Sequence, residues 1–219
     1  MTRMFLVLAI GLASPALGAD PSVSRVLGSI DIAADRTVGD VSTVNGAIEI
    51  GPHASVAAVA TVNGHLRLAA GAKADSMTTV NGSVTLEAAA QVKGAVTTVN
   101  GHLELAPGAD VGGNLGNVNG DVTVDGAHVA GRLRTSTGSI ETIHGAHIDG
   151  GILVDDEEHT WWGLFGSGRP RIVIGPGSVI GGTLRFDRKV KLYVSDRAVL
   201  TGTIEGAVPT KFSGDKAPD

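Results

Sequence analysis

The sequence has no cysteine and few aromatic residues, which make up 3% of its 219 positions. The lack of cysteine excludes a disulfide scaffold, a cysteine metal site and a thiol nucleophile. Aromatic side chains usually supply much of the buried area of a core, so a core here must come from Ala, Val, Leu and Ile. A net charge of −5 argues against general nucleic-acid binding.

Long apolar runs are also lacking beyond the first residues. An apolar run from residue 4 to residue 13 follows Arg3, and the small residues Ala16 and Gly18 stand near a cleavage position. This pattern is typical of a secretory signal peptide, here residues 1–18. The run is too short to span a bilayer. The alternative to a signal peptide is a buried N-terminal helix. We expect an exported protein of the periplasm, extracellular space or cell envelope, with no transmembrane segment.

Glycine, by contrast, is abundant, and much of it belongs to a repeat. A Val-Asn-Gly triplet recurs five times at nearly equal spacing. Apolar residues alternate after each triplet, as at Ile48 and Ile50, and period two predicts a strand. A short repeat of this kind, with a period of about 20 residues, indicates a solenoid. The Asn-Gly pairs are Asn45-Gly46, Asn63-Gly64, Asn81-Gly82, Asn100-Gly101 and Asn119-Gly120.

Two all-β folds fit this repeat. Asn-Gly is a strong hairpin signal, but equivalent residues of an antiparallel meander would lie about 10 Å apart and need not match. In a parallel β-helix they stack about 4.8 Å apart. Here Thr43, Thr61 and Thr79 match, as do the asparagines. We therefore predict a single-stranded parallel β-helix of about nine coils of about 18 residues, with an asparagine ladder and positive φ at each following glycine.

One insertion interrupts the frame. The β-helix domain is expected to cover residues 19–207, and residues 155–171 stand where a regular coil has only Asn-Gly-Ala, so an inserted loop is expected at that corner. Beyond it, the frame aligns Phe186 with Val62 and Leu192 with Leu68. Residues 208–219 contain proline, glycine and scattered charge, so they are expected to form a flexible tail.

The insertion carries the clearest candidate binding residues. Long loops on a rigid scaffold often hold binding sites, and tryptophan is enriched in binding hot spots. The aromatics either pack on the coil flank or contact a protein, glycan or membrane partner. Basic residues follow, and they either attract an anionic envelope polymer or pair with the acidic residues 155–158. The candidate binding residues are Trp161, Trp162, Phe165, Arg171, Lys189 and Lys191, with Arg169, Arg185 and Arg188 beside them.

Other chemistry is less well supported. His128, His144 and His147 fall on neighbouring coils near Asp149, and imidazole with carboxylate suits zinc, but nothing fixes a ligand geometry. Polysaccharide hydrolysis needs two carboxylates facing across a cleft. Glu49 and Glu141 instead share one outward column with Glu104. Two six-residue units near residues 174–181 fit the hexapeptide repeat of acyltransferases only weakly. We predict no catalytic residue, no metal and no cofactor.

The repeat over about residues 26–207, including the stretch from Ile174 to Leu184, resembles the bactofilins, whose β-helical coils polymerise end to end. It is also similar to the adhesin-type repeats of bacterial envelopes. Bactofilins are typically cytoplasmic or membrane-associated, and the signal pattern departs from that.

The resemblance implies a polymer-forming or adhesin-like solenoid and supplies no catalytic residue. We expect an exported structural protein that self-associates through its coil ends, preferentially the N-terminal one, or presents its loop to an envelope glycan or protein. The alternative is a glycan- or ligand-binding module, followed by a polysaccharide-acting enzyme.

Overall fold

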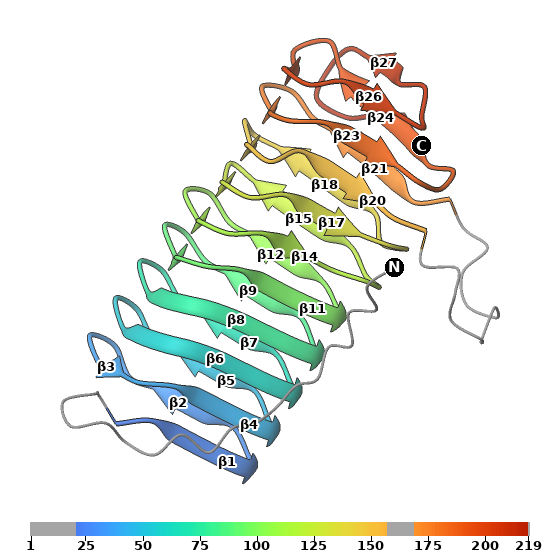
Figure 1. Cartoon of the computed structure of the whole chain (residues 1–219). Coiled ribbons are helices and arrows are strands. Elements are labelled where there is room, and N and C mark those ends of the chain that lie inside the picture. The colour runs from blue at the N-terminus through green and yellow to red at the C-terminus, as the bar shows by residue number, and fades with distance from the viewer. Residues whose placement is uncertain (1–20, 157–168, 219) are drawn as a thin grey trace.

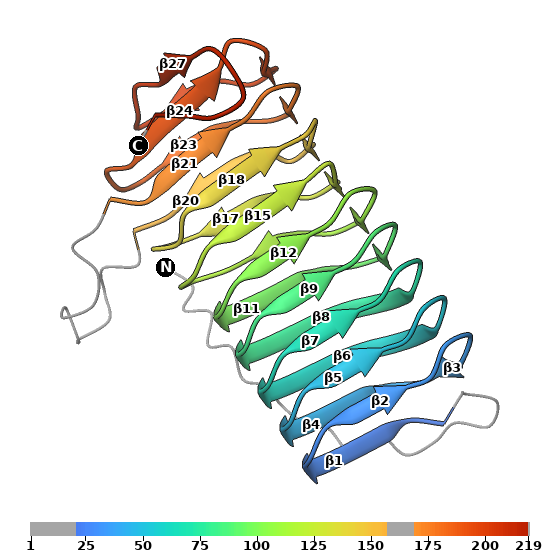
Figure 2. The same ribbon diagram turned by 180° about the vertical axis from the view of Figure 1, so that it is seen from behind.

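The computed structural model describes residues 21–156 and 169–218, which form one rod of stacked coils (Figure 1). Successive strands of each sheet pair in parallel along the whole rod. The same order is seen from behind in Figure 2. The described ranges contain no helix, and hence none that could cross a membrane. The predicted parallel β-solenoid is confirmed, and the antiparallel meander is wrong.

The large sheet holds seventeen strands, and most coils contribute two. Its strands are β1 (Val23–Leu27), β3 (Thr37–Val38), β4 (Val41–Asn45), β6 (Ser55–Asn63), β8 (Lys73–Asn81), β10 (Gln91–Val92), β11 (Val96–Asn100), β13 (Asp110–Val111), β14 (Leu115–Gly116), β16 (His128–Val129), β17 (Leu133–Thr135), β19 (His147–Ile148), β20 (Ile152–Val154), β22 (Val179–Ile180), β23 (Leu184–Phe186), β25 (Val199–Leu200) and β26 (Ile204–Glu205).

The small sheet holds ten strands, one from each coil, so the rod has about ten turns where the sequence predicted about nine. Its strands are β2 (Ile30–Ile32), β5 (Ile48–Ile50), β7 (Leu66–Leu68), β9 (Val84–Leu86), β12 (Leu103–Leu105), β15 (Val122–Asp125), β18 (Ile140–Ile143), β21 (Arg171–Ile174), β24 (Lys191–Ser195) and β27 (Thr210–Phe212).

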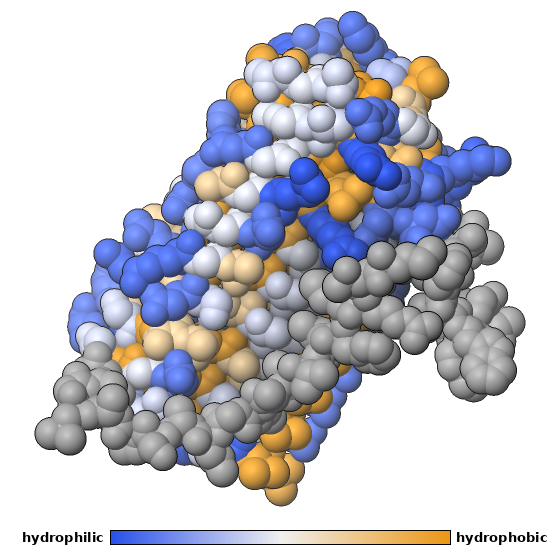
Figure 3. All heavy atoms as spheres, in the orientation of Figure 1, coloured by the Kyte–Doolittle hydropathy of each residue, from blue (hydrophilic) through white to orange (hydrophobic). Residues whose placement is uncertain are grey.

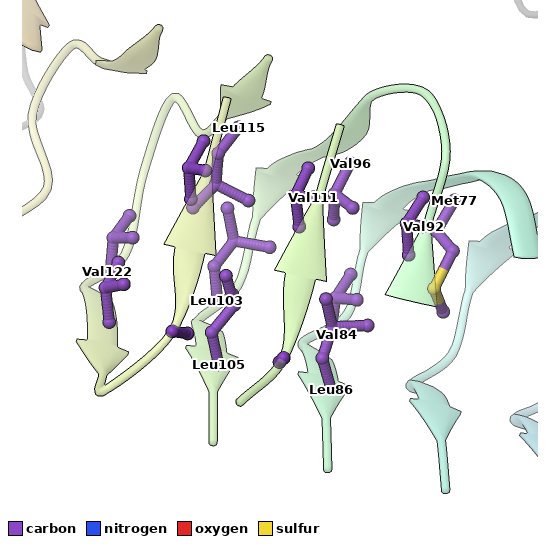
Figure 4. Close-up of a cluster of buried hydrophobic side chains, with 14 of the residues drawn as sticks. Met77, Val84, Leu86, Val92, Val96, Leu103, Leu105, Val111, Leu115 and Val122 are labelled. Carbon is purple, nitrogen blue, oxygen red and sulfur yellow. The ribbon is translucent and has the colours of Figure 1, made fainter. Parts of the chain in front are cut away.

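The core lies between the two sheets and is almost entirely aliphatic. Leu86 and Leu105 of the small sheet face the interior, as do Val96 and Leu115 of the large sheet (Figure 4), and all four are fully buried. Each such side chain contributes about 1.5–3 kcal/mol when it is removed from water. Period-two alternation directs these residues inward on every coil, which is how a chain with so few aromatics builds a continuous core.

The matching columns of the repeat stack in register. Thr43, Thr61 and Thr79 pair with one another on β4, β6 and β8, and the column continues to Thr98. These threonines are buried. The Oγ1 of Thr61, for example, donates to the carbonyl of Gly46 at 3.1 Å, so the buried hydroxyl is paired as such groups require.

The stacking continues on the far side of the insertion. Ile140 pairs with Val122 on the preceding coil and with Ile172 on the following one. The insertion therefore falls at one corner, and the chain after it resumes in the same column of the small sheet. The return comes earlier than the end of the expected loop, because Arg171 already belongs to β21.

The predicted alignment of the next coil is wrong. Leu192 pairs with Ile172 rather than falling in the column of Leu68, and Phe186 pairs with Val154 on the inward side. A shift of one residue moves a side chain to the other face of a strand. Phe186 is thereby buried rather than outward. The coil between β21 and β24 is longer than a regular one, so an unbroken count along the chain fails here.

The C-terminal segment is not wholly a flexible tail. Residues 210–212 form β27, which pairs in parallel with β24 despite the preceding Pro209. Arg197 then contacts the carboxylate of Asp215 at 2.5 Å, and Arg171 donates to the carbonyl of Pro218 at 2.9 Å. Because these two arginines lie at opposite ends of the small-sheet strands, the segment folds back beside the last coils.

Candidate interaction surfaces

The predicted asparagine ladder forms along one corner of the rod. The Nδ2 of Asn63 donates to the Oδ1 of Asn45 at 2.8 Å, and the Nδ2 of Asn81 donates to Asn63 at 2.9 Å. The bonds continue at 3.0 Å through Asn100 and Asn119. The amides are exposed, yet each one bonds to its equivalent on the next coil. The ladder therefore has a structural role.

The glycines of these corners serve a purpose other than the predicted one. Gly46, Gly64, Gly82 and Gly101 do not have positive φ, although Gly120 does, with φ of 116°. A Cβ on Gly82 would lie 2.5 Å from the carbonyl carbon of Gly64 and closer still to its oxygen. Glycine is required because the backbones of successive coils approach each other too closely for a side chain.

The base of the insertion is tied to the rod by a buried carboxylate. Asp155 accepts hydrogen bonds from the Oγ of Ser136 at 2.6 Å and from the Nε of Arg134 at 2.5 Å. Arg188 donates to the carbonyl of Ser136 at 2.9 Å. Charge-assisted bonds of this kind are among the stronger ones in proteins. The sequence analysis considered pairing of the acidic residues 155–158 with the basic residues that follow the insertion, and it did not identify Arg134 and Ser136 as the partners of Asp155.

The predicted basic residues lie near that base but do not form one site. Arg171 stacks over the ring of Tyr193, with its guanidinium carbon 5.2 Å from the ring centroid. Lys191 pairs in register with Arg171 and is exposed, as is Lys189. Arg185 bonds Asp187, which raises the pKa of the guanidinium further. Trp161, Trp162 and Phe165 lie outside the described residues.

A shallow depression of about 250 Å³ lies beside Arg171 on the outer face of the small sheet. Its lining includes the polar residues Asp121, Thr123, Ser139 and Glu141. Polar residues from three neighbouring coils therefore line one shallow depression.

The histidines near Asp149 form a hydrogen-bonded chain. The Nδ1 of His128 lies 2.6 Å from the Oδ1 of Asp110, and its Nε2 lies 3.1 Å from the Oδ2 of Asp149. His147 contacts the other oxygen of Asp149 at 2.8 Å. His144 instead pairs with Asp125. Within residues 21–156 and 169–218, no group of three potential ligands is arranged to hold a metal ion.

The outward glutamates have the predicted arrangement. Glu49, Arg67 and Thr85 occupy successive rungs of one column, and Glu104, Thr123 and Glu141 follow. Arg67 bonds Glu87, which raises the pKa of the arginine. The glutamates point the same way from one flat face, whereas glycoside hydrolysis needs carboxylates that face each other.

The two ends of the rod carry the exposed apolar residues. Among the described residues, four large apolar side chains are strongly exposed: Val26 and Leu27 on the first coil, and Val199 and Val208 on the last. Figure 3 shows hydrophobic residues at the tip formed by β1. In the described part of the chain, β1 pairs only with β4, and β2 only with β5. The first coil thus presents unpaired strand edges together with apolar side chains.

The fold and these surfaces define a β-solenoid repeat protein. No family model, curated protein or solved structure matches the chain.

Proposed function

We propose that this chain is an exported, structural β-solenoid of the cell envelope that self-associates through its coil ends and presents its insertion to a partner. One observation supports the proposal most directly. Among the described residues, all of the strongly exposed large apolar side chains lie on the first and last coils. Open strand edges template pairing with another chain. The role is also the one implied by the resemblance of the repeat to bactofilins and envelope adhesins. No catalytic residue is assigned.

The proposed contact is a closed dimer in which two N-terminal coils meet. Among the described residues the last coil also has unpaired edges, because β25, β26 and β27 pair only with β22, β23 and β24, but its exposed Val199 and Val208 are nine residues apart in the chain whereas Val26 and Leu27 are adjacent. A head-to-head contact uses the same surface on both copies and closes, whereas a head-to-tail contact generates filaments. The N-terminal edge, with Val26 and Leu27, supplies the self-complementary patch.

Light scattering over a concentration series of the secreted chain tests this. The expected result is a dimer in the micromolar range. The dimer Kd should rise at least about tenfold in Leu27→Glu, because like charges then face each other across the contact. Thr85→Glu, which adds the same charge to the outer face at mid-rod, should leave the dimer intact. A strict monomer at high micromolar concentration would refute self-association. Filaments in negative stain would refute the closed dimer and indicate a head-to-tail contact instead.

Export has its own test. The signal pattern predicts a mature chain that starts near Ala19 or Asp20. N-terminal sequencing of the protein from the periplasm or medium checks this. Finding Met1 intact on a cytoplasmic protein contradicts the proposed location.

The depression beside Arg171 favours glycan binding as a second function. Calorimetric titration with an N-acetylglucosamine oligosaccharide should show binding that weakens about tenfold in Glu141→Ala, because one hydrogen bond to a charged group is lost. Glu104→Ala, from the same column two coils away, is the matched control. Equal affinity of both variants, or no binding at millimolar sugar, rules out this site.

A further inference from the structure

The middle of the rod carries a polar chain that bridges three coils on the outer side of the large sheet. Asp110, His128 and His147 occupy successive rungs, on β13, β16 and β19. Asp149 follows β19 and contacts both imidazoles. The four side chains are between 40% and 48% exposed, so solvent protons reach them freely.

The geometry favours a positive charge on His128. Both of its ring nitrogens face carboxylate oxygens, at 2.6 and 3.1 Å. A neutral imidazole has one N–H and one lone pair, so it can bond only one of the two carboxylates and directs a lone pair at the other. The imidazolium donates to both Asp110 and Asp149, and these bonds are charge-assisted.

The strands at this place are short. β13, β16 and β19 have two residues each, whereas β6 and β8 have nine. Backbone bonds nevertheless continue past these strands, for example from the amides of Asp149 and Gly150 to the carbonyls of Val129 and Gly131, so the side-chain contacts add a second connection between coils that the backbone already joins.

We propose that Asp110, His128, Asp149 and His147 form a pH-dependent clamp across three coils, which closes in mildly acidic solution and loosens above neutrality. The clamp adds a regulatory element to the rod and does not depend on the proposed assembly or location. The rungs that flank it in the ladder are uncharged: Gln91 precedes Asp110, and Val179 follows His147. The nearest further titratable pair, Asp125 and His144, precedes His128 and His147 by three residues and bonds within itself.

The titration directions agree with this clamp. The hydrogen bond to Asp110, then that to Asp149, raises the pKa of His128 above 6.5. The stabilisation from His128 is thus fully present below about pH 6.5 and is lost as the pH rises through the raised pKa. The bond to His128 lowers the pKa of Asp149 below 3.8. Its stabilisation is present above about pH 3.8 and is lost as the pH falls through the lowered pKa. The clamp is therefore strongest between about pH 4 and 6.5.

NMR titration of the histidine Cε1 protons in the full chain tests the proposal. The midpoint of His128 should lie above 6.5 and move down in Asp110→Asn and in Asp149→Asn. Asp125→Asn, which removes the carboxylate of the neighbouring pair, should leave the midpoint of His128 in place. A wild-type midpoint at or below 6.5 overturns the clamp, even where a variant fails to fold.

Amide hydrogen exchange adds a readout that reports on the coils themselves. The amides of His128 and His147 bond the carbonyls of Ala109 and Ala127 on the preceding coils. Their protection, corrected for intrinsic rates, should fall between about pH 6 and 8.5 by up to about tenfold for one unit of pKa difference. His128→Gln should abolish this pH dependence. Protection that is equal at both pH values in the wild type, or a midpoint that shifts with EDTA or added zinc, refutes a proton clamp.

Discussion

The close approach of glycine corners predicts that Gly82→Ala disrupts the rod far more than its size suggests. The new Cβ would meet the backbone of Gly64, and backbone cannot rotate away as a side chain can. Overpacking of this kind costs about 1–3 kcal/mol. Separating the corners also strains the bonds between Asn81 and its ladder neighbours, each worth about 0.5–1.5 kcal/mol.

Together these effects amount to about 2–4 kcal/mol, or a fall of about 5–15 °C in Tm for a chain of this length. Far-ultraviolet circular dichroism, which reports on strand content, follows the melting of the purified mature protein. Gly116→Ala, in β14 of the large sheet, is the control, because its Cβ would meet only Thr97 side-chain atoms at 3.8 Å, an ordinary contact. A similar Tm for both variants refutes the close-approach argument.

Three further outcomes follow from the contacts above. Asn81→Ala removes two ladder bonds and should lower Tm by about 2–12 °C, as measured by calorimetry; no change would show that the ladder bonds add nothing to stability. Asp155→Asn should speed limited proteolysis of the insertion several-fold while leaving the Tm of the rod within a few degrees, because the bonds to Ser136 and Arg134 anchor only its base. Phe186→Ala should lower the free energy of unfolding in urea by about 3–5 kcal/mol, since the ring is buried. A near-neutral effect would show that Phe186 lies on the surface.

Stacking explains how far the sequence alone reaches. In a parallel solenoid each residue lies beside its equivalent on the next coil, so the same side chain is selected at each repeat, as at Thr61 and Thr79. That demand leaves the repeat visible in the sequence, and it determined the fold, the parallel pairing, the asparagine ladder and the corner at which the frame is interrupted. The outward column of glutamates followed from the same frame.

Tertiary structure decided what the repeat does not encode. The spacing between β21 and β24 depends on a corner of irregular length, so the register there is visible only in the pairing of Leu192 with Ile172. The role of Gly82 depends on the distance between two backbones rather than on its own φ. The strand β27 is stabilised by pairing with β24, which overrides the signal of Pro209.

The polar contacts were likewise only partly predictable from the sequence. The sequence placed His128 and His147 on neighbouring coils near Asp149. It did not identify Asp110 as the second partner, although Asp110 precedes His128 by one regular repeat and that offset was available as a signal. Side-chain pairing across coils depends on rotamer and on strand orientation, which only the folded chain fixes. Likewise, Asp155 reads as part of an acidic run in sequence, but the corner of the fold turns it toward Ser136 and makes it the anchor of the insertion.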